Sequence, residues 1–236
     1  MSTARARQSP PASEVLEELQ RRFVVETSPI TAFGRELELV SPRNAEELIS
    51  EEEFERDERL PYWADLWPSS YALADRVAGE RVAKGSTPAR LLELGCGLGL
   101  VTIAAMTAGF DVVATDYYDD ALLFTRANVW RVLGRDPAVR LVDWRSLPDD
   151  IGVFDRVVAA DVIYEQRYAA IVSEVLARTL APDGEALIAD PGRTALKEFL
   201  RECEARGLGV ASVEAWQYAE GAVKQTILVH QIVRSA

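Results

Sequence analysis

A glycine-rich segment and the acidic residue that follows it are the part of the sequence best suited to bind a small molecule. The segment reads Glu-Leu-Gly-Cys-Gly-Leu-Gly over residues 93–99, and Asp116 ends the next apolar stretch. Glycines allow a sharp bend and a close approach of a ligand to the main chain. The two oxygens of Asp116 can accept hydrogen bonds from both hydroxyl groups of a ribose. We therefore expect a site for a ribose-containing ligand, with helix capping or a turn as the alternative role of Asp116.

The spacing of the glycines separates this segment from the dinucleotide-binding fingerprint G-x-G-x-x-G. That fingerprint requires a glycine at position 100, where the sequence has Leu100. The segment instead carries an acid, Glu93, whose carboxylate would repel a pyrophosphate and attract a ligand with ammonium and sulfonium groups. The pattern therefore disfavours a dinucleotide oxidoreductase.

The elements that must position these residues alternate between strand and helix from residue 90 onward. Strands are expected over residues 90–94, 111–115, 139–142, 154–160 and 185–189, and helices over residues 100–108, 119–133, 166–180 and 194–206. Asp119 can cap the second of these helices, and a turn at Pro182-Asp183-Gly184 closes the third. Two last strands, over residues 210–217 and 225–233, are expected to form a hairpin-like end. This alternation predicts an α/β fold with parallel strands, in which ligands bind beyond the carboxyl ends of the strands.

The glycine segment and Asp116 together resemble the first two motifs of class I, seven-strand S-adenosylmethionine-dependent methyltransferases, and the similarity covers residues 62–234. The resemblance implies a Rossmann-like, mostly parallel seven-stranded sheet with helices on both faces and a C-terminal antiparallel strand. It implies S-adenosylmethionine as the cofactor. Gly95 and Gly97 would then contact its methionine part, and Asp116 its ribose.

Further contacts with the cofactor follow from the same resemblance. Tyr117 would pack on the adenine, with an exposed turn aromatic as the alternative. Asp143 would reach the exocyclic amine of the adenine, and Trp144 would pack on the ring or belong to the core. Cys96 would act through its small size and its backbone. The expected cofactor-binding residues are Trp67, Glu93, Gly95, Cys96, Gly97, Asp116, Tyr117, Asp143, Trp144 and Ala160. For Trp67 a place in the core is the alternative.

Three segments narrow the resemblance to one branch. They are Pro-Tyr-Trp-Ala-Asp-Leu-Trp-Pro-Ser-Ser over residues 61–70, the pair Asp143-Trp144, and Ala-Asp-Val-Ile-Tyr-Glu over residues 160–165. Together they are similar to the methyltransferase-16 family, which includes many protein lysine N-methyltransferases, and most of all to the members that modify the electron-transfer flavoprotein β-subunit. This resemblance implies that Asp161 and Tyr164 are the catalytic residues.

The chemistry of lysine methylation suits these two residues. An amine must lose its proton before it attacks, and lysine starts from a pKa of about 10.4. An apolar, aromatic-lined mouth lowers that pKa by desolvation. Asp161 can hold the amine, and aromatic rings such as Tyr164 attract a methylammonium by roughly 0.5–2 kcal/mol. The alternatives are a helix cap for Asp161 and a wall residue for Tyr164.

Composition and charge exclude several classes of protein. The chain has 236 residues, 48% of them hydrophobic, and a net charge of −12, which argues against a binder of nucleic-acid backbones. One histidine, His230, excludes a metal site with two histidine ligands, and we expect no metal. Cys96 and Cys203 form no disulfide pattern, and Cys203, in a late helix, is expected in the core. The longest uncharged run, residues 94–110, is too short to span a membrane. We expect a cytoplasmic protein that does not bind membranes.

The sequence before residue 61 differs from the rest. We expect a disordered tail over residues 1–12, a helix and hairpin extension over residues 13–60, and the methyltransferase domain over residues 61–236. Short strands are expected at residues 23–25 and 36–40, on either side of a turn-rich stretch over residues 28–34 that contains Pro29, and a helix is expected over residues 43–60. Residues 46–60 hold eight acidic residues and two arginines, a net charge of −6. This segment either forms a solvated helical face or attracts a lysine-rich substrate surface by its negative charge.

Three functions are compatible with these features. The first is N-methylation of a lysine side chain in a protein substrate. The alternatives are a small-molecule N- or O-methyltransferase of the same fold, and a noncatalytic module that binds the cofactor. No Asn-Pro-Pro-Tyr segment follows the fourth strand, which counts against amino-N6-adenine and glutamine methyltransferases. No cysteine ends this strand, as it does in 5-cytosine methyltransferases.

Overall fold

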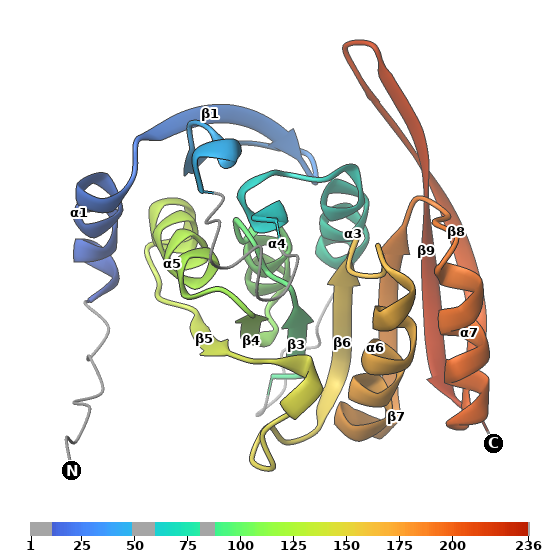
Figure 1. The fold of residues 1–236 in the computed structure, drawn as a ribbon. Helices are drawn as coiled ribbons and strands as arrows, with labels where there is room; N and C mark the ends of the chain where they lie inside the picture. The colour runs from blue at the N-terminus through green and yellow to red at the C-terminus, as the bar shows by residue number, and fades with distance from the viewer. Residues whose placement is uncertain (1–10, 49–59, 81–87, 236) are drawn as a thin grey trace.

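A seven-stranded sheet forms the centre of the protein (Figure 1). The computed structural model describes residues 11–48, 60–80 and 88–235. The strand order is β5-β4-β3-β6-β7-β9-β8, with the first five strands parallel and β9 antiparallel to both β7 and β8. The strands are β3 (Arg90–Leu94), β4 (Asp111–Asp116), β5 (Ala138–Leu141), β6 (Phe154–Ala160), β7 (Leu180–Asp190), β8 (Leu208–Glu220) and β9 (Val223–Arg234). The predicted α/β fold class is confirmed.

Helices cover both faces of this sheet, as predicted. One face carries α3 (Pro68–Ala78), α4 (Leu100–Ala108) and α5 (Asp119–Leu133), and the other carries α6 (Gln166–Thr179) and α7 (Leu196–Ala205). The strands supply both faces in alternation, so that Val157 packs under α6 while Val158 packs under α3. Helix α3 was not predicted, although Pro68 at its first position is a common helix start.

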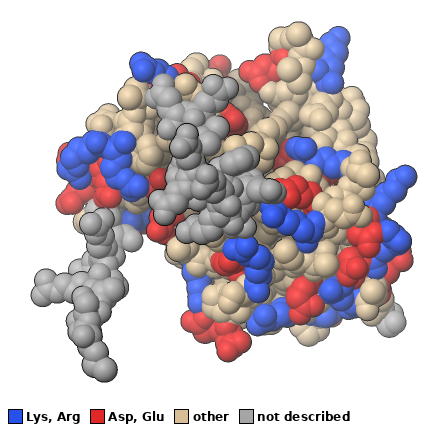
Figure 2. Space-filling model, viewed as in Figure 1, with Lys and Arg blue, Asp and Glu red and all other residues tan. Residues whose placement is uncertain are grey.

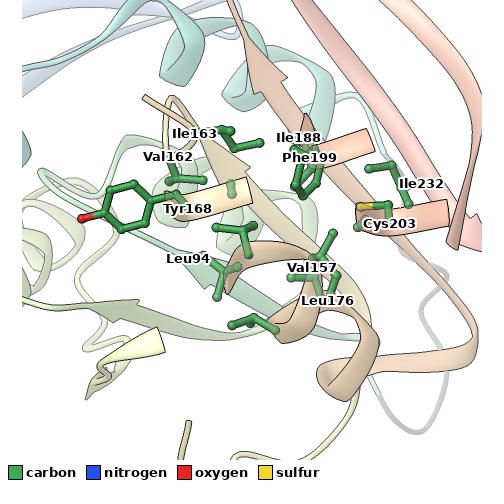
Figure 3. Close-up of a cluster of buried hydrophobic side chains, with 14 of the residues drawn as sticks. Leu94, Val157, Val162, Ile163, Tyr168, Leu176, Ile188, Phe199, Cys203 and Ile232 are labelled. Atoms are coloured by element: carbon green, nitrogen blue, oxygen red, sulfur yellow. The ribbon is translucent and has the colours of Figure 1, made fainter. Parts of the chain in front are cut away.

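A cluster of buried hydrophobic side chains fills the space between the sheet and the helices α6 and α7. Figure 3 shows Leu94, Val157 and Ile188 of the sheet packed against Leu176 and Phe199 of the two helices. Cys203 lies in this cluster and is buried, which confirms its predicted place in the core. The ring of Tyr168 packs at the edge of the cluster, and its hydroxyl oxygen points away from it.

Two strands extend beyond their predicted limits. A turn was predicted at residues 182–184, but β7 runs from Leu180 to Asp190 with a register shift opposite Phe154 and Arg156. Gly184 permits this irregularity, because a Cβ there would lie 3.0 Å from the carbonyl oxygen of Phe154. The predicted C-terminal hairpin is longer than expected: β8 continues to Glu220, and Gly221 turns the chain with a φ of 56°.

The N-terminal part forms a helix, α1 (Ala12–Arg22), and a two-stranded sheet, β1 (Val25–Ala32) and β2 (Arg35–Pro42). The strand predicted at residues 23–25 is wrong, since β1 begins where that range ends. The residues around Pro29 were expected to turn, but they continue the strand; β1 has one free edge, where a missing N–H is tolerated. The turn is at Phe33 and Gly34, both with positive φ.

Asn128 of α5 joins this N-terminal part to the glycine-rich loop. Its side-chain oxygen accepts a hydrogen bond from the backbone N–H of Val40 at 2.7 Å. Its amide nitrogen donates to the carbonyl oxygens of Val40 and Leu98, each at 2.9 Å. A buried side-chain amide with these partners is well satisfied. The N-terminal part is therefore connected directly to the loop that borders the binding site.

The helix predicted over residues 43–60 is represented by one short 3-10 helix, η1 (Ala45–Leu48). The rest of that prediction, including most of the acidic segment, falls on residues 49–59, which lie outside the described residues. On the visible face, Figure 2 shows acidic and basic side chains intermixed over α6 and α7. Arg206, which follows α7, forms an ion pair with Glu174 of α6, with 3.1 Å between Nε and Oε2.

Candidate functional site

A cavity of about 380 Å³ lies at the carboxyl ends of the parallel strands. The chain order reverses between β3 and β6, and such a point is where α/β sheets bind ligands. All the residues predicted to bind the cofactor or to act in catalysis line this one cavity: Trp67, Glu93, Gly95, Cys96, Gly97, Asp116, Tyr117, Asp143, Trp144, Ala160, Asp161 and Tyr164. The structure thus brings together residues that lie far apart in the sequence.

The loop after β3 depends on its glycines. Gly95, Gly97 and Gly99 have φ values of 72°, 52° and 84°, which side-chain-bearing residues rarely adopt. A Cβ at Gly97 would lie 3.1 Å from the carbonyl oxygen of Trp63, and one at Gly95 would lie 3.2 Å from Val162 Cγ1. The loop therefore forms a close-fitting cradle that only glycine permits.

Asp116 shapes this cradle from the neighbouring strand. Its Oδ2 accepts a hydrogen bond from the backbone N–H of Gly97 at 3.0 Å, and its Oδ1 accepts from the N–H groups of Tyr117 at 2.8 Å and Tyr118 at 3.1 Å. The residue is only 5% exposed, and burial raises the pKa of its carboxyl while these hydrogen bonds oppose the rise. Asp119 was predicted to cap α5; it is instead the first residue of that helix, and Tyr118 is the N-cap.

Glu93 is a second buried acid in the cavity. It is 3% exposed, and Thr102 Oγ1 donates a hydrogen bond to its Oε2. Burial raises the pKa of Glu93 to about 8, and the charge of Asp116 adds to the rise. A cation placed next to Glu93 would favour its ionised form. The pair of buried acids is suited to a ligand that carries positive charge.

The wall formed by the residues after β5 combines an ion pair with an indole. The Asp143 carboxylate accepts hydrogen bonds from Arg145 Nε at 2.9 Å and Nη2 at 2.7 Å, so in this structure it faces Arg145. The Trp144 ring lies edge-on to Tyr168, with centroids 6.0 Å apart, and packs against the core while lining the cavity. Its Nε1 is buried without a hydrogen-bond partner among the described residues.

Aromatic rings surround the entrance on the side of α6. The ring centroid of Tyr164 is 5.3 Å from that of Tyr62 and 4.8 Å from that of Tyr168. Tyr62 also meets Trp67 edge-on at 5.9 Å. The hydroxyl group of Tyr164 donates a hydrogen bond to that of Tyr168 at 3.2 Å. The sequence indicated Tyr164 and Trp67, but it gave no sign of Tyr168.

Asp161 lies at this entrance with a φ of 59°, an unusual value for a residue other than glycine. Its Oδ2 accepts a hydrogen bond from Ser69 Oγ at 2.8 Å, and its Oδ1 accepts from Arg193 Nε at 2.8 Å. The alternative role as a helix cap is wrong, because the N-cap of α6 is Glu165. Ser69 and Arg193 were both missed in the sequence. The position of Arg193, just beyond the carboxyl end of β7, was an available signal.

His230 and Cys203, which the sequence analysis left outside the site, also lie outside the cavity. His230 is buried in β9, where burial lowers its pKa, and Cys203 belongs to the core. Among the described residues, no helix combines the length and the apolar character needed to cross a bilayer.

The residues present fit S-adenosylmethionine. The glycine cradle admits a ligand close to the main chain, Glu93 suits the ammonium and sulfonium charges of the cofactor, and Asp116 can accept hydrogen bonds from its ribose. Trp144 Nε1, which has no hydrogen-bond partner within residues 11–48, 60–80 and 88–235, offers a donor within a largely aromatic wall. S-adenosylmethionine is accordingly the cofactor for which this donor set is suited.

Comparisons with known proteins agree with this geometry. A sequence profile of the family described as lysine methyltransferase matches residues 47–206. The electron transfer flavoprotein beta subunit lysine methyltransferase of Xenopus laevis is 28% identical over 138 residues, 56% of this chain and 53% of that protein. Protein-lysine N-methyltransferase rrg1 of Schizosaccharomyces pombe is 30% identical over 168 residues, 66% of this chain and 49% of that protein. The chain thus spans about half the length of the curated relatives it matches.

Solved structures share the fold. A magnesium protoporphyrin IX methyltransferase of Synechocystis, crystallised with bound S-adenosylmethionine, has a TM-score of 0.55 at 20% identity, over 78% of this chain and 92% of that one. A precorrin-6y C5,15-methyltransferase of Geobacter metallireducens has a TM-score of 0.54 at 15% identity, over 70% and 88%. These likenesses establish the Rossmann-like methyltransferase fold. Because the profile match spans more than half of the sequence, this chain belongs to the lysine methyltransferase family.

Proposed function

We propose that this protein transfers the methyl group of S-adenosylmethionine to the side-chain amine of a lysine in a protein substrate. The observation that carries the proposal is the convergence of two sets of residues on one cavity. Glu93 and Asp116 belong to β3 and β4, whereas Asp161 and Tyr164 follow β6, on the other side of β3. The first set suits a cationic cofactor and the second suits an amine.

The chain's own residues would bind, orient and desolvate the reactants. When bound, S-adenosylmethionine supplies a methyl carbon on a cationic sulfur, so the amine nitrogen forms the new bond as the carbon–sulfur electrons return to sulfur. Asp116 and the glycine cradle would fix the cofactor, and Asp161 would hold the amine in line with the methyl group. Such positioning carries much of the rate in a displacement of this kind.

The aromatic rings at the entrance have two roles in this proposal. They exclude water from the lysine amine, which lowers its pKa and favours the neutral nucleophile. Once the amine carries a methyl group and regains charge, Tyr62, Trp67 and Tyr164 attract it through their faces. The proton that the amine loses before the attack passes to solvent at the open entrance.

The acceptor is the part of the function on which the named relatives offer most guidance. The printed name of the Xenopus relative points to the electron transfer flavoprotein beta subunit as the first substrate to test. We infer that the acceptor is a protein and that neither a nucleic acid nor a membrane takes part. We also infer a cytoplasmic compartment, since Cys96 and Cys203 are both free, buried thiols.

The test is transfer of a labelled methyl group into a cell lysate fractionated by size. We expect label in the protein fraction, and mass spectrometry should place it on a lysine. The same assay with the variant Asp161→Asn should show little labelling, while the variant still binds S-adenosylhomocysteine. Label found only in the small-molecule fraction would overturn the protein substrate in favour of a small-molecule acceptor.

A further inference from the structure

Arg193 makes the ionic contact to the proposed catalytic carboxylate. Its Nε and Nη2 both donate hydrogen bonds to Asp161 Oδ1, the first at 2.8 Å, while Ser69 Oγ donates to Oδ2 at 2.8 Å. An ionised carboxylate offers about four lone-pair sites. Among the described residues these donors occupy three of them, so a site on Oδ2 is left for a hydrogen bond from an acceptor amine.

The backbone at Arg193 is fixed from the core by Asp190, the last residue of β7. Asp190 is fully buried, and its Oδ1 accepts hydrogen bonds from the N–H groups of Gly192 and Arg193, each at 2.7 Å. The guanidinium carbon lies 6.0 Å from the centroid of the Trp67 ring. The Arg193 side chain is 34% exposed and lines the cavity, whereas that of Asp161 is only 6% exposed. The cation is therefore held where the acceptor must enter.

A carboxylate without a partner would work against the reaction. An opposite charge stabilises the ammonium form of a lysine, and an ammonium has no lone pair with which to attack. The guanidinium of Arg193 is permanently charged and is bonded to the same carboxylate as the incoming amine would be. It cancels the attraction of Asp161 for a second cation but leaves the hydrogen-bond acceptor in place.

We propose that Arg193 is a positioning residue for methyl transfer: it aims Asp161 at the acceptor and keeps the acceptor amine in its neutral, nucleophilic form. This inference rests on the proposed function, because it needs an amine as the acceptor. Within the part of the chain that the structure describes, the other titratable groups that line this part of the cavity or act on the pair are Tyr62, Asp65, Tyr164, Glu165, Tyr168 and Asp190. These six groups are acids and phenols, so none of them carries a positive charge that would disfavour the ammonium form of the acceptor amine.

The test compares the pH dependence of methyl transfer by the wild-type chain, Arg193→Gln and Arg193→Lys. The readout is labelled methyl incorporated into acid-precipitated lysate protein between about pH 6.5 and about pH 10. For Arg193→Gln we expect the rising limb of the profile to move up by about one pH unit or more. The methyl-transfer rate of Arg193→Gln should be lower than that of the wild type by at least about tenfold near pH 7, and the difference should shrink at high pH. Arg193→Lys keeps the charge, so its limb should stay at the wild-type position, at a lower rate because the two-pronged contact is lost.

Two controls separate this role from a structural one. Arg178→Gln removes a surface arginine that lies 3.7 Å from Asp149, and its profile should match that of the wild type. S-adenosylhomocysteine should bind Arg193→Gln with wild-type affinity, measured by calorimetry. An equal loss of methyl-transfer rate at every pH in Arg193→Gln would overturn the inference. So would a shift of the rising limb of the pH profile in Arg193→Lys. Absence of protein label with the wild-type chain overturns the proposed function instead, so the two failures are distinguishable.

Discussion

The carboxylate of Asp116 accepts a hydrogen bond from the backbone N–H of Gly97, with 3.0 Å between Oδ2 and N. This bond connects the end of β4 to the loop after β3, at the residue where a Cβ would lie 3.1 Å from the carbonyl oxygen of Trp63. The acid expected to hold the ribose therefore also holds the loop expected to hold the methionine part. Cofactor binding and loop conformation should be lost together when this carboxylate is removed.

Asp116→Ala should weaken binding of S-adenosylhomocysteine by at least about 1.5 kcal/mol, roughly tenfold or more in dissociation constant. The variant loses both the carboxylate and its three backbone partners. Isothermal titration calorimetry measures the effect. Asp111→Ala, an exposed acid at the start of the same strand, is the matched control and should bind as the wild type does. Wild-type affinity in Asp116→Ala would place the ribose elsewhere.

Affinity for S-adenosylhomocysteine should increase as pH rises from about 6 to about 8. The cause is Glu93, whose pKa is raised to about 8 by burial, so that its proton must leave when the ligand's ammonium arrives beside it. Titrations in buffers of different ionisation enthalpy should detect the released proton. Glu93→Gln should bind more weakly and without this pH dependence. An equally steep pH dependence in Glu93→Gln would show that another group titrates.

The same raised pKa predicts how the stability of the ligand-free protein changes with pH. Between pH 4.5 and about 8 the unfolded chain loses the Glu93 proton while the folded chain retains it. The unfolded state then binds fewer protons, so the free energy of unfolding should fall as pH rises through this range. Glu93→Gln should remove that part of the decline, as measured by urea denaturation at several pH values. A decline of the same size in the variant would assign it to other groups.

Gly99→Ala should destabilise the fold more than Gly134→Ala does. Both glycines have positive φ, 84° and 63°, so each alanine carries about 1–2 kcal/mol of backbone strain. At Gly99 a Cβ would also lie 3.0 Å from the Cα of Thr125, whereas nothing lies within 4 Å at Gly134. Thermal unfolding of the two variants isolates the steric contribution. Equal melting temperatures would mean that the loop accommodates a Cβ at residue 99 without an additional loss of stability.

The parts of the site that the residues alone predicted are those whose spacing is local, whereas Asp161 and Tyr164 were expected only from the family resemblance. Glu93 and Gly97 belong to one short segment, and Asp116 ends the apolar strand that follows. Arg193 and Ser69 were missed because their contacts with Asp161 join residues 32 and 92 positions apart. Only the packing of α3 and of the turn after β7 against β6 brings them together.

The fold, too, was predicted correctly where the signal lies in a short segment and incorrectly where it depends on pairing between segments. Alternating apolar segments predicted the parallel strands and their helices, since each pattern is short and repeats along the chain. The N-terminal hairpin was misjudged because Pro29 is a turn residue by type, whereas its place opposite Glu38 in a two-stranded sheet depends on pairing with β2. Residue type alone does not report which strand edge is free.

Asp161→Asn should reduce the turnover of methyl transfer at least about a hundredfold while leaving the affinity for S-adenosylhomocysteine within a factor of about two. Asparagine tolerates the φ of 59° at this position, so the backbone should keep its conformation. The amide cannot offer two anionic oxygens, so the contacts with Ser69 and Arg193 compete with the acceptor amine for a single carbonyl oxygen. Asp183→Asn, an exposed position in β7, is the matched control and should leave both quantities unchanged. Parallel loss of affinity and turnover in Asp161→Asn would move Asp161 from the acceptor side of the cavity to the cofactor side, and Arg193 would then have to be assigned to the cofactor as well.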